Sequence, residues 1–310
     1  MRSALTASVA LLVAVIVAAC SSGGGSSPSA STAAPASPSA AASESAVPSA
    51  TANACAKDSL ELMTAGTLTI GADNPAFPPY FSDDPADPSW EIGNPNNGKG
   101  FESAVAYEIA KRLGFGTSDV TWVPVTFNNA IAPGDKPFDI YLTQVSYSAE
   151  RAQAVDLSDG YLDQSQTVIA LADNPIASVT TVEGLKAFKL GAPVGTTSYT
   201  YIVDNIKPTT EASVYDTLDA AIQALSVKQI DGVLVDLPTA FYATAVQLDN
   251  GKIVGTLPTV GEVEHFSVVL DKGSPLTACV NSTLAAMKDD GTLQDITDEW
   301  ITGAGAPELK

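Results

Sequence analysis

Polar residues stand just beyond three predicted strands, and their types suit a ligand that carries both charges. Ser146 and Arg151 follow one strand, Thr196 and Thr197 follow a second, and Asp236 ends a third. The planar fork of an arginine matches a carboxylate, because it donates two parallel hydrogen bonds. The carboxylate of Asp236 suits an ammonium group. Together these residues predict a clamp for the two charged groups of an α-amino acid.

Taken alone, Arg151 has a simpler interpretation as a surface ion pair with Glu150 or Asp156, which would contribute little. The chain holds 15 Lys+Arg against 35 Asp+Glu, so cations are scarce in it. The position of Arg151 near Ser146, just past a strand, is what favours a binding role.

Alternating strand and helix patterns from about Cys55 onward predict an α/β fold with mostly parallel sheets. In such folds ligands bind in the crevice outside the carboxyl ends of the strands. We expect strands over residues 68–72, 120–125, 138–142, 167–171, 189–192, 232–235 and 266–270. Helices are expected over residues 102–113, 182–188, 198–206, 217–227, 238–248 and 275–288.

Four further residues are candidates for the same site. Gln144 lies in the polar end of the strand that contains residues 138–142, and Phe77, Tyr80 and Tyr161 are candidate aromatic walls. The segment 195–198 opens a predicted helix, whose free N–H groups favour an anion.

Catalytic and metal-binding patterns are weak in this sequence. Residues 93–99 mimic a phosphate-binding loop, but Gly100 stands where a Ser or Thr is required and no strand precedes them. His265 is the single histidine, so a His-rich metal site is excluded and any Ser-His-Asp triad would depend on this residue. No G-x-S-x-G elbow accompanies it. We expect no cofactor and no metal.

The N-terminus predicts export. Residues 1–19 read as a signal peptide, and Cys20 after two alanines resembles a bacterial lipoprotein cleavage site. An ordinary signal peptide with an incidental cysteine is the alternative. Residues 20–54, rich in Ser, Ala and Pro, predict a disordered tether of roughly 30 Å reach behind the lipid anchor.

Two cysteines then remain, Cys55 and Cys279. In an oxidising compartment they predict one disulfide between the start of the domain and a C-terminal helix, with two buried free thiols as the alternative. The net charge of −20 makes nucleic acid and anionic lipid poor partners.

The order of several motifs resembles the family 3 extracellular solute-binding proteins, which serve polar amino-acid ABC importers. The matching segments lie at residues 68–73, 78–80, 100–102, 109–114, 146–151, 155–158, 195–197, 231–236 and 290–300.

This resemblance implies a type II periplasmic-binding-protein fold, with two α/β lobes joined by a two-segment hinge. Residues 55–163 and 263–310 would form the first lobe and residues 164–262 the second. Arg151 would hold the ligand carboxylate with Ser146 and Thr197, and Asp236 the ammonium. Glu102 replaces the usual Asp, Gln144 a smaller residue, and residues 83–99 form an insertion.

The function expected is that of a monomeric, extracytoplasmic, lipid-anchored receptor that captures an amino acid and delivers it to ABC permease subunits. Two alternatives share the resemblance. One is an exported cyclohexadienyl dehydratase, an enzyme on the same fold, and the other is a sensory lipoprotein.

Overall fold

The structure is a computed structural model that describes residues 54–301 and 306–310. The predicted signal peptide, Cys20 and nearly all of the linker lie outside these residues. In the described part of the chain, no helix is long and apolar enough to cross a membrane.

The first lobe contains a five-stranded sheet in the order β2-β1-β3-β12-β4. Strand β1 (Leu68–Ala72) is buried at every position and runs parallel to both of its neighbours, β2 (Val120–Pro124) and β3 (Ile140–Tyr141). Strand β12 (Val269–Leu270) returns antiparallel between β3 and β4 (Asp156–Leu157). An apolar strand flanked on both sides in parallel needs cover on both faces.

Three helices of this lobe pack together: α1 (Phe101–Arg112), α8 (Leu276–Asp289) and α9 (Thr292–Trp300). The shorter helices α2 (Phe127–Ile131) and α3 (Arg151–Ala154) follow strand ends. Gly100 precedes α1 with a φ of 92°, and a Cβ there would lie 2.6 Å from the carbonyl oxygen of Tyr80. Only glycine fits that close approach.

The second lobe contains a five-stranded sheet in the order β10-β6-β9-β7-β8. The strands are β6 (Gln166–Leu171), β7 (Leu190–Pro193), β8 (Ser213–Tyr215), β9 (Gly232–Asp236) and β10 (Gly251–Thr256). The helices are α4 (Val182–Leu185), α5 (Thr197–Tyr201), α6 (Leu218–Ser226) and α7 (Leu237–Tyr242). Single π turns, Ile202–Ile206 and Ala243–Gln247, continue α5 and α7.

The α/β class is confirmed, but the sheets are less parallel than expected. Strands β6 and β10 pair antiparallel in the second sheet, as β12 does in the first. Strands β6 and β12 each follow directly on a segment that joins the lobes, so neither is preceded by a helical crossover that would make it parallel.

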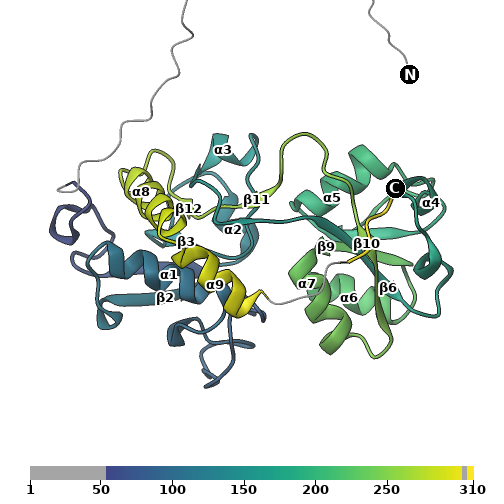
Figure 1. Ribbon diagram of the computed structural model, residues 1–310, viewed down its shortest axis with the longest axis horizontal. Coiled ribbons are helices and arrows are strands. Elements are labelled where there is room, and N and C mark those ends of the chain that lie inside the picture. Colours follow the sequence, from purple (N-terminus) through teal and green to yellow (C-terminus); the bar gives the residue numbers. More distant parts are fainter. Residues whose placement is uncertain (1–53, 302–305) are drawn as a thin grey trace, which may run out of the picture. The chain divides into compact units, whose positions relative to one another are not determined.

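The two joining segments pair with each other. Strand β5 (Leu162–Asp163) leads out of the first lobe and β11 (His265–Phe266) leads back, in an antiparallel pair. Figure 1 shows both segments running between the two sheets.

The C-terminal residues differ from the expected division, which placed 263–310 in the first lobe. The N–H of Leu309 donates to the carbonyl of Thr256, 2.9 Å away, and that of Lys310 to Thr180. Leu309 is buried in the core of the second lobe, and the C-terminus lies beside α4 (Figure 1). The chain end docks there because Leu309 is apolar and is buried in that core. Nothing before Leu309 in the sequence indicates the change of lobe.

The expected disulfide is confirmed. Cys55 is bonded to Cys279 of α8, with 5.4 Å between the Cα atoms and a sequence separation of 224 residues. Closing so long a loop contributes at most about 5 kcal/mol on the chain-entropy account.

Candidate functional site

A cavity of about 620 Å³ is lined by residues of both lobes. Strand ends supply much of its wall, as the α/β rule predicts. Seven of the nine residues expected to bind a ligand line it: Arg151, Ser146, Asp236, Thr196, Thr197, Phe77 and Gln144. The structure therefore brings together polar groups that are up to 92 positions apart in the sequence, between Gln144 and Asp236.

Arg151 begins the short helix α3, and its side chain is 8% exposed. One guanidinium nitrogen donates to the carbonyl of Ser146 at 2.5 Å, and another donates to the carbonyl of Gly195 in the second lobe at 2.7 Å. Its carbon lies 5.3 Å from the ring centre of Phe127. No ion pair joins Arg151 to a carboxylate of the described residues.

Burial lowers the pKa of Arg151 to about 10, against the opposing effect of the charges on Glu264 and Glu150. The guanidinium therefore stays positive at neutral pH. A buried cation that forms no ion pair with the described residues is suited to receive a carboxylate, because a guanidinium has five N–H donors and only two of its nitrogens donate here.

The two threonines have different roles. Thr196 caps α5, because its hydroxyl accepts from the N–H of Tyr199 at 3.2 Å and donates to the carbonyl of Pro193. Thr197 lies 3.4 Å from the Ser146 hydroxyl across the lobes, and it also donates to Glu264. Of the two threonines, Thr197 is therefore the one whose hydroxyl lies near Ser146, the residue to whose carbonyl Arg151 donates.

Asp236 ends β9 and caps α7. Its carboxylate accepts the N–H of Thr239 at 2.9 Å and the hydroxyl of Thr239 at 2.8 Å. The hydroxyl of Tyr80, in the first lobe, donates to the same carboxylate at 2.5 Å. Burial raises the pKa of Asp236, and these hydrogen bonds oppose the rise. The arrangement fixes a carboxylate at the cavity wall, and no lysine or arginine of residues 54–301 or 306–310 forms an ion pair with it.

Tyr80 and Tyr161 were expected to form aromatic walls of the site, but neither residue lines the cavity. Tyr80 is 1% exposed and Tyr161 is 2% exposed. Both rings pack against Phe266, at centroid distances of 6.1 and 6.3 Å. Their rings complete the core of the first lobe, while Tyr80 reaches the cavity only through its bond to Asp236.

Glu102 is buried and is hydrogen-bonded to Gln144, which is half-buried and lines the cavity. The Glu102 carboxylate accepts from the N–H of Gln144 at 2.6 Å, from the Gln144 side-chain amide, and from Tyr161 at 2.5 Å. Gln144 has a φ of 42°, in the left-handed region that a residue with a side chain rarely adopts. Burial raises the pKa of Glu102 to about 7.

Sequence reasoning missed Asp73, Glu91, Asp216 and Asp219, which also line the cavity. Asp73 directly follows β1, so the strand-end argument that selected Asp236 would have found it. Glu91 lies in the insertion at 83–99, where no periodic pattern indicates which side chains turn toward a site.

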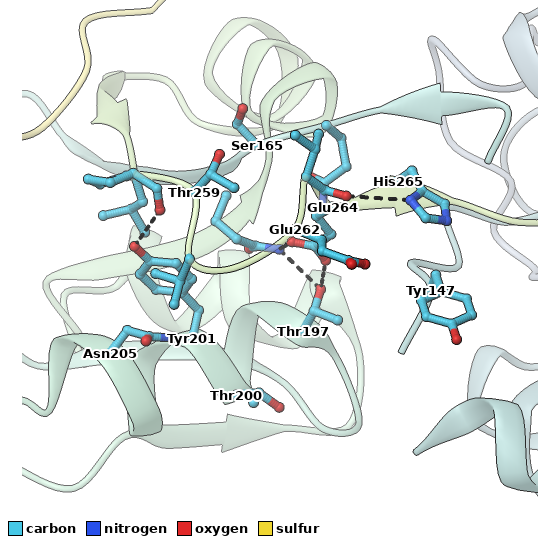
Figure 2. Close-up of a pocket in the computed structure, with 16 residues that line it drawn as sticks. Tyr147, Ser165, Thr197, Thr200, Tyr201, Asn205, Thr259, Glu262, Glu264 and His265 are labelled. Atoms are coloured by element: carbon cyan, nitrogen blue, oxygen red, sulfur yellow. Dashed lines mark hydrogen bonds between the residues drawn. The ribbon is translucent and has the colours of Figure 1, made fainter. Parts of the chain in front are cut away.

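A smaller cavity of about 250 Å³ lies beside the hinge (Figure 2). Glu264 accepts from Thr197 and from the Gln166 amide, the latter at 2.8 Å. His265 stacks on Tyr147 with ring centroids 5.5 Å apart, which agrees with a structural role. Within residues 54–301 and 306–310, no cluster of side chains could hold a metal ion.

The chain belongs to the bacterial extracellular solute-binding proteins, family 3, whose model matches residues 80–303. Two relatives come from Escherichia coli strain K12. The L-cystine-binding protein TcyJ is 29% identical over 241 residues, which is 76% of this chain and 83% of its own length. The ABC transporter arginine-binding protein 1 is 29% identical over 229 residues, 73% of this chain and 87% of its own.

Solved structures show the same fold. An ancestral arginine-binding protein bound to arginine is 27% identical with a TM-score of 0.61, and it covers 76% of this chain and 99% of its own. An ancestral amino acid-binding protein, described as a precursor of cyclohexadienyl dehydratase, is 26% identical with a TM-score of 0.61 over 76% of this chain and 96% of its own. The type II binding-protein fold expected from the sequence is confirmed.

Proposed function

We propose that this protein captures a free α-amino acid between its lobes and delivers it to the permease subunits of an ABC importer. One observation carries the proposal: Arg151 and Asp236, from different lobes, line one cavity as opposite charges. Neither is neutralised by a protein ion pair in the described part of the chain. An α-amino acid carries the two complementary charges.

In this mechanism Arg151 donates to the ligand carboxylate, assisted by the hydroxyls of Ser146 and Thr197. Asp236 accepts from the ligand ammonium, while Phe77 and Gln144 contact the rest of the ligand. Because the charges sit on different lobes, the ligand stabilises the closed arrangement and the empty protein opens about the hinge. The closed, loaded form is what a permease would recognise.

The closed contacts already present support hinge closure. Arg151 reaches the carbonyl of Gly195, and Tyr80 reaches Asp236, so each charged group bridges the lobes. A ligand carboxylate would take the place of the neutral Gly195 carbonyl as the partner of the guanidinium, which is a stronger interaction for a cation.

The names of the relatives agree with transport rather than catalysis, and we propose that this chain is not an enzyme. The dehydratase alternative came from the family resemblance, and the structural neighbour described as a precursor of cyclohexadienyl dehydratase is itself named as an amino acid-binding protein. Incubation of the protein with prephenate or arogenate tests it, and turnover of either would overturn the binding-only proposal.

Lipid anchoring at Cys20 is part of the proposal. The family is extracellular, and the lipobox-like sequence before Cys20 would hold a monomeric domain at the membrane surface. In intact cells, Cys20→Ala would release the protein into the soluble fraction. Retention of this variant in the membrane fraction would contradict the anchor.

The clamp is tested by calorimetry with a mixture of amino acids and then with single ones. Arg151→Ala would weaken binding by about 3–5 kcal/mol, because a buried ligand carboxylate loses its partner. Arg112→Ala is the matched control, since Arg112 pairs with Glu108 and Asp290 away from the cavity. Equal affinity of the Arg151 variant and the native protein would refute the clamp.

A further inference from the structure

The charges that line the larger cavity are unbalanced. Five carboxylates line it, from Asp73, Glu91, Asp216, Asp219 and Asp236, and Arg151 is the one cation that the described residues contribute. The clamp for an α-amino acid uses Arg151 and Asp236. The remaining four carboxylates form no ion pair with a lysine or arginine of the described chain.

Asp73 is the most enclosed of the four. It follows β1, is partly buried, and accepts the N–H of Asn74 at 2.8 Å. Burial raises its pKa, with the backbone hydrogen bond to Asn74 in opposition. A partly desolvated carboxylate at a ligand cavity gains most from a cation that enters beside it.

The insertion at 83–99 holds Glu91 against the same wall. The N–H of Glu91 donates to the side chain of Asn74 at 2.8 Å, next to Asp73. The carbonyl of the following residue, Ile92, accepts from Ala76 at 2.9 Å. At Gly93 a Cβ would lie 1.9 Å from the carbonyl oxygen of Ala76, so this close docking requires glycine.

Asp219 lines the same cavity from the second lobe. It lies in the first turn of α6, and its carboxylate accepts from the Gln247 amide at 3.1 Å. Its pKa is raised first by burial, and the negative charge of Glu91 adds to the rise. Glu91 and Asp219 thus bring like charges from the two lobes to the lining of one cavity.

We propose that the cavity selects amino acids whose side chain is positively charged, with Asp73 as the side-chain partner and Glu91 and Asp219 as the rim that enforces the choice. This inference rests on the proposed function, because it assumes that the ligand backbone occupies the clamp. Repulsion between Glu91 and Asp219 opposes closure around a neutral or acidic ligand, and a cation relieves it. Specificity thus comes partly from a repulsive element.

The same charge distribution disfavours ligands with a second carboxylate. Glutamate carries one on its side chain, and no second cation from residues 54–301 or 306–310 lines the cavity to receive it. Two relatives are named for cystine and arginine, and the charges of this chain favour the second kind of ligand.

Calorimetry with L-arginine and L-citrulline tests the charge alone, because citrulline replaces the guanidinium with a neutral group of similar shape. We expect arginine to bind at least about 30-fold more tightly. In Asp73→Asn the preference should fall by about 10-fold, while citrulline affinity stays close to native. Asp204→Asn, which removes an exposed carboxylate outside the cavity lining, is the matched control.

The rim is tested by association kinetics. The double variant Glu91→Gln, Asp219→Asn should bind arginine several-fold more slowly at low salt and lose much of the salt dependence. Glu211→Gln, at an exposed position outside the cavity lining, should retain both.

The outcomes separate the two proposals. Equal affinity for arginine and citrulline, or an unchanged preference in Asp73→Asn, would overturn the charge selection and leave the Arg151-dependent clamp standing. Preference for glutamate or cystine would do the same. Failure of every α-amino acid to bind would overturn the proposed function and this inference with it.

Discussion

The hydroxyl of Tyr80 lies 2.5 Å from a carboxylate oxygen of Asp236, and this bond joins the two lobes across the cavity. Tyr80 belongs to the core of the first lobe, where its ring meets that of Phe266 edge-on. Asp236 caps α7 in the second lobe. A residue of one core therefore orients the carboxylate that is proposed to hold the ligand ammonium.

Tyr80→Phe should weaken ligand binding by about tenfold, because a hydrogen bond to a charged acceptor contributes about 1.5–3 kcal/mol and part of it stabilises the closed form. Calorimetry with the preferred amino acid measures the change. Tyr107→Phe is the matched control, since the Tyr107 hydroxyl donates to the carbonyl of Asn96 within the first lobe. Tighter binding in Tyr80→Phe would show that the phenol competes with the ligand, contrary to this account.

Glu102 predicts a dependence of stability on pH. Burial raises its pKa from 4.5 to about 7, so between these values the folded chain keeps a proton that the unfolded chain has released. The contribution to the free energy of unfolding is fully present below about pH 4.5 and is lost as pH rises through 7, by about 3 kcal/mol in all.

Urea unfolding at pH 5 and at pH 8 measures this effect as a difference between native protein and Glu102→Gln. The variant should lose less stability over the interval, because glutamine has no proton to release. Glu108→Gln, on the same helix α1, should keep the native pH dependence over this interval, because ion pairs with Lys111 and Arg112 keep the pKa of Glu108 low. Parallel pH profiles for native protein and Glu102→Gln would contradict the assignment.

Protonation of Glu102 should also affect the binding site, because Glu102 is hydrogen-bonded to Gln144. The ionised carboxylate of Glu102 accepts from three donors, two of them on Gln144, and a protonated carboxyl cannot accept all three equally well. Gln144 lines the cavity in an uncommon backbone conformation that these bonds support.

Strand ends explain what could be predicted from the sequence. Arg151, Ser146 and Asp236 are predictable because polar residues that follow buried strands lie at the strand-end edge of each sheet, and the two edges face the same cavity. The disulfide followed from cysteine parity in an exported chain. These inferences need only local patterns and a general rule about where strands end.

Residues that depend on side-chain direction were not predictable in the same way. Tyr161 turns into the core to donate to Glu102, although its sequence position equally suits a cavity wall. Glu91 reaches the cavity because Gly93, two residues later, packs closely against Ala76, which lies 17 positions earlier in the sequence. Such packing is decided by tertiary contacts that no periodic pattern reveals.

The C-terminal residues predict a limit on lobe opening. Ile301 packs against the core of the first lobe, while Leu309 is buried at 2% exposure in that of the second. The few residues between them span at most about 3.6 Å each, so the docked chain end acts as a third connection. A Cβ at Gly255 would lie 2.9 Å from Leu309, which shows how closely the chain end docks on β10.

Leu309→Ala should destabilise the protein by about 2–5 kcal/mol, because it removes buried methyl groups and leaves a cavity. The ligand-free variant should also open further, seen as a larger radius of gyration by solution scattering, while saturating ligand restores the native value. Val246→Ala, at a 64% exposed position of the same lobe, should change neither quantity. Native scattering from a destabilised Leu309 variant would show that the chain end stabilises the second lobe without restraining the hinge.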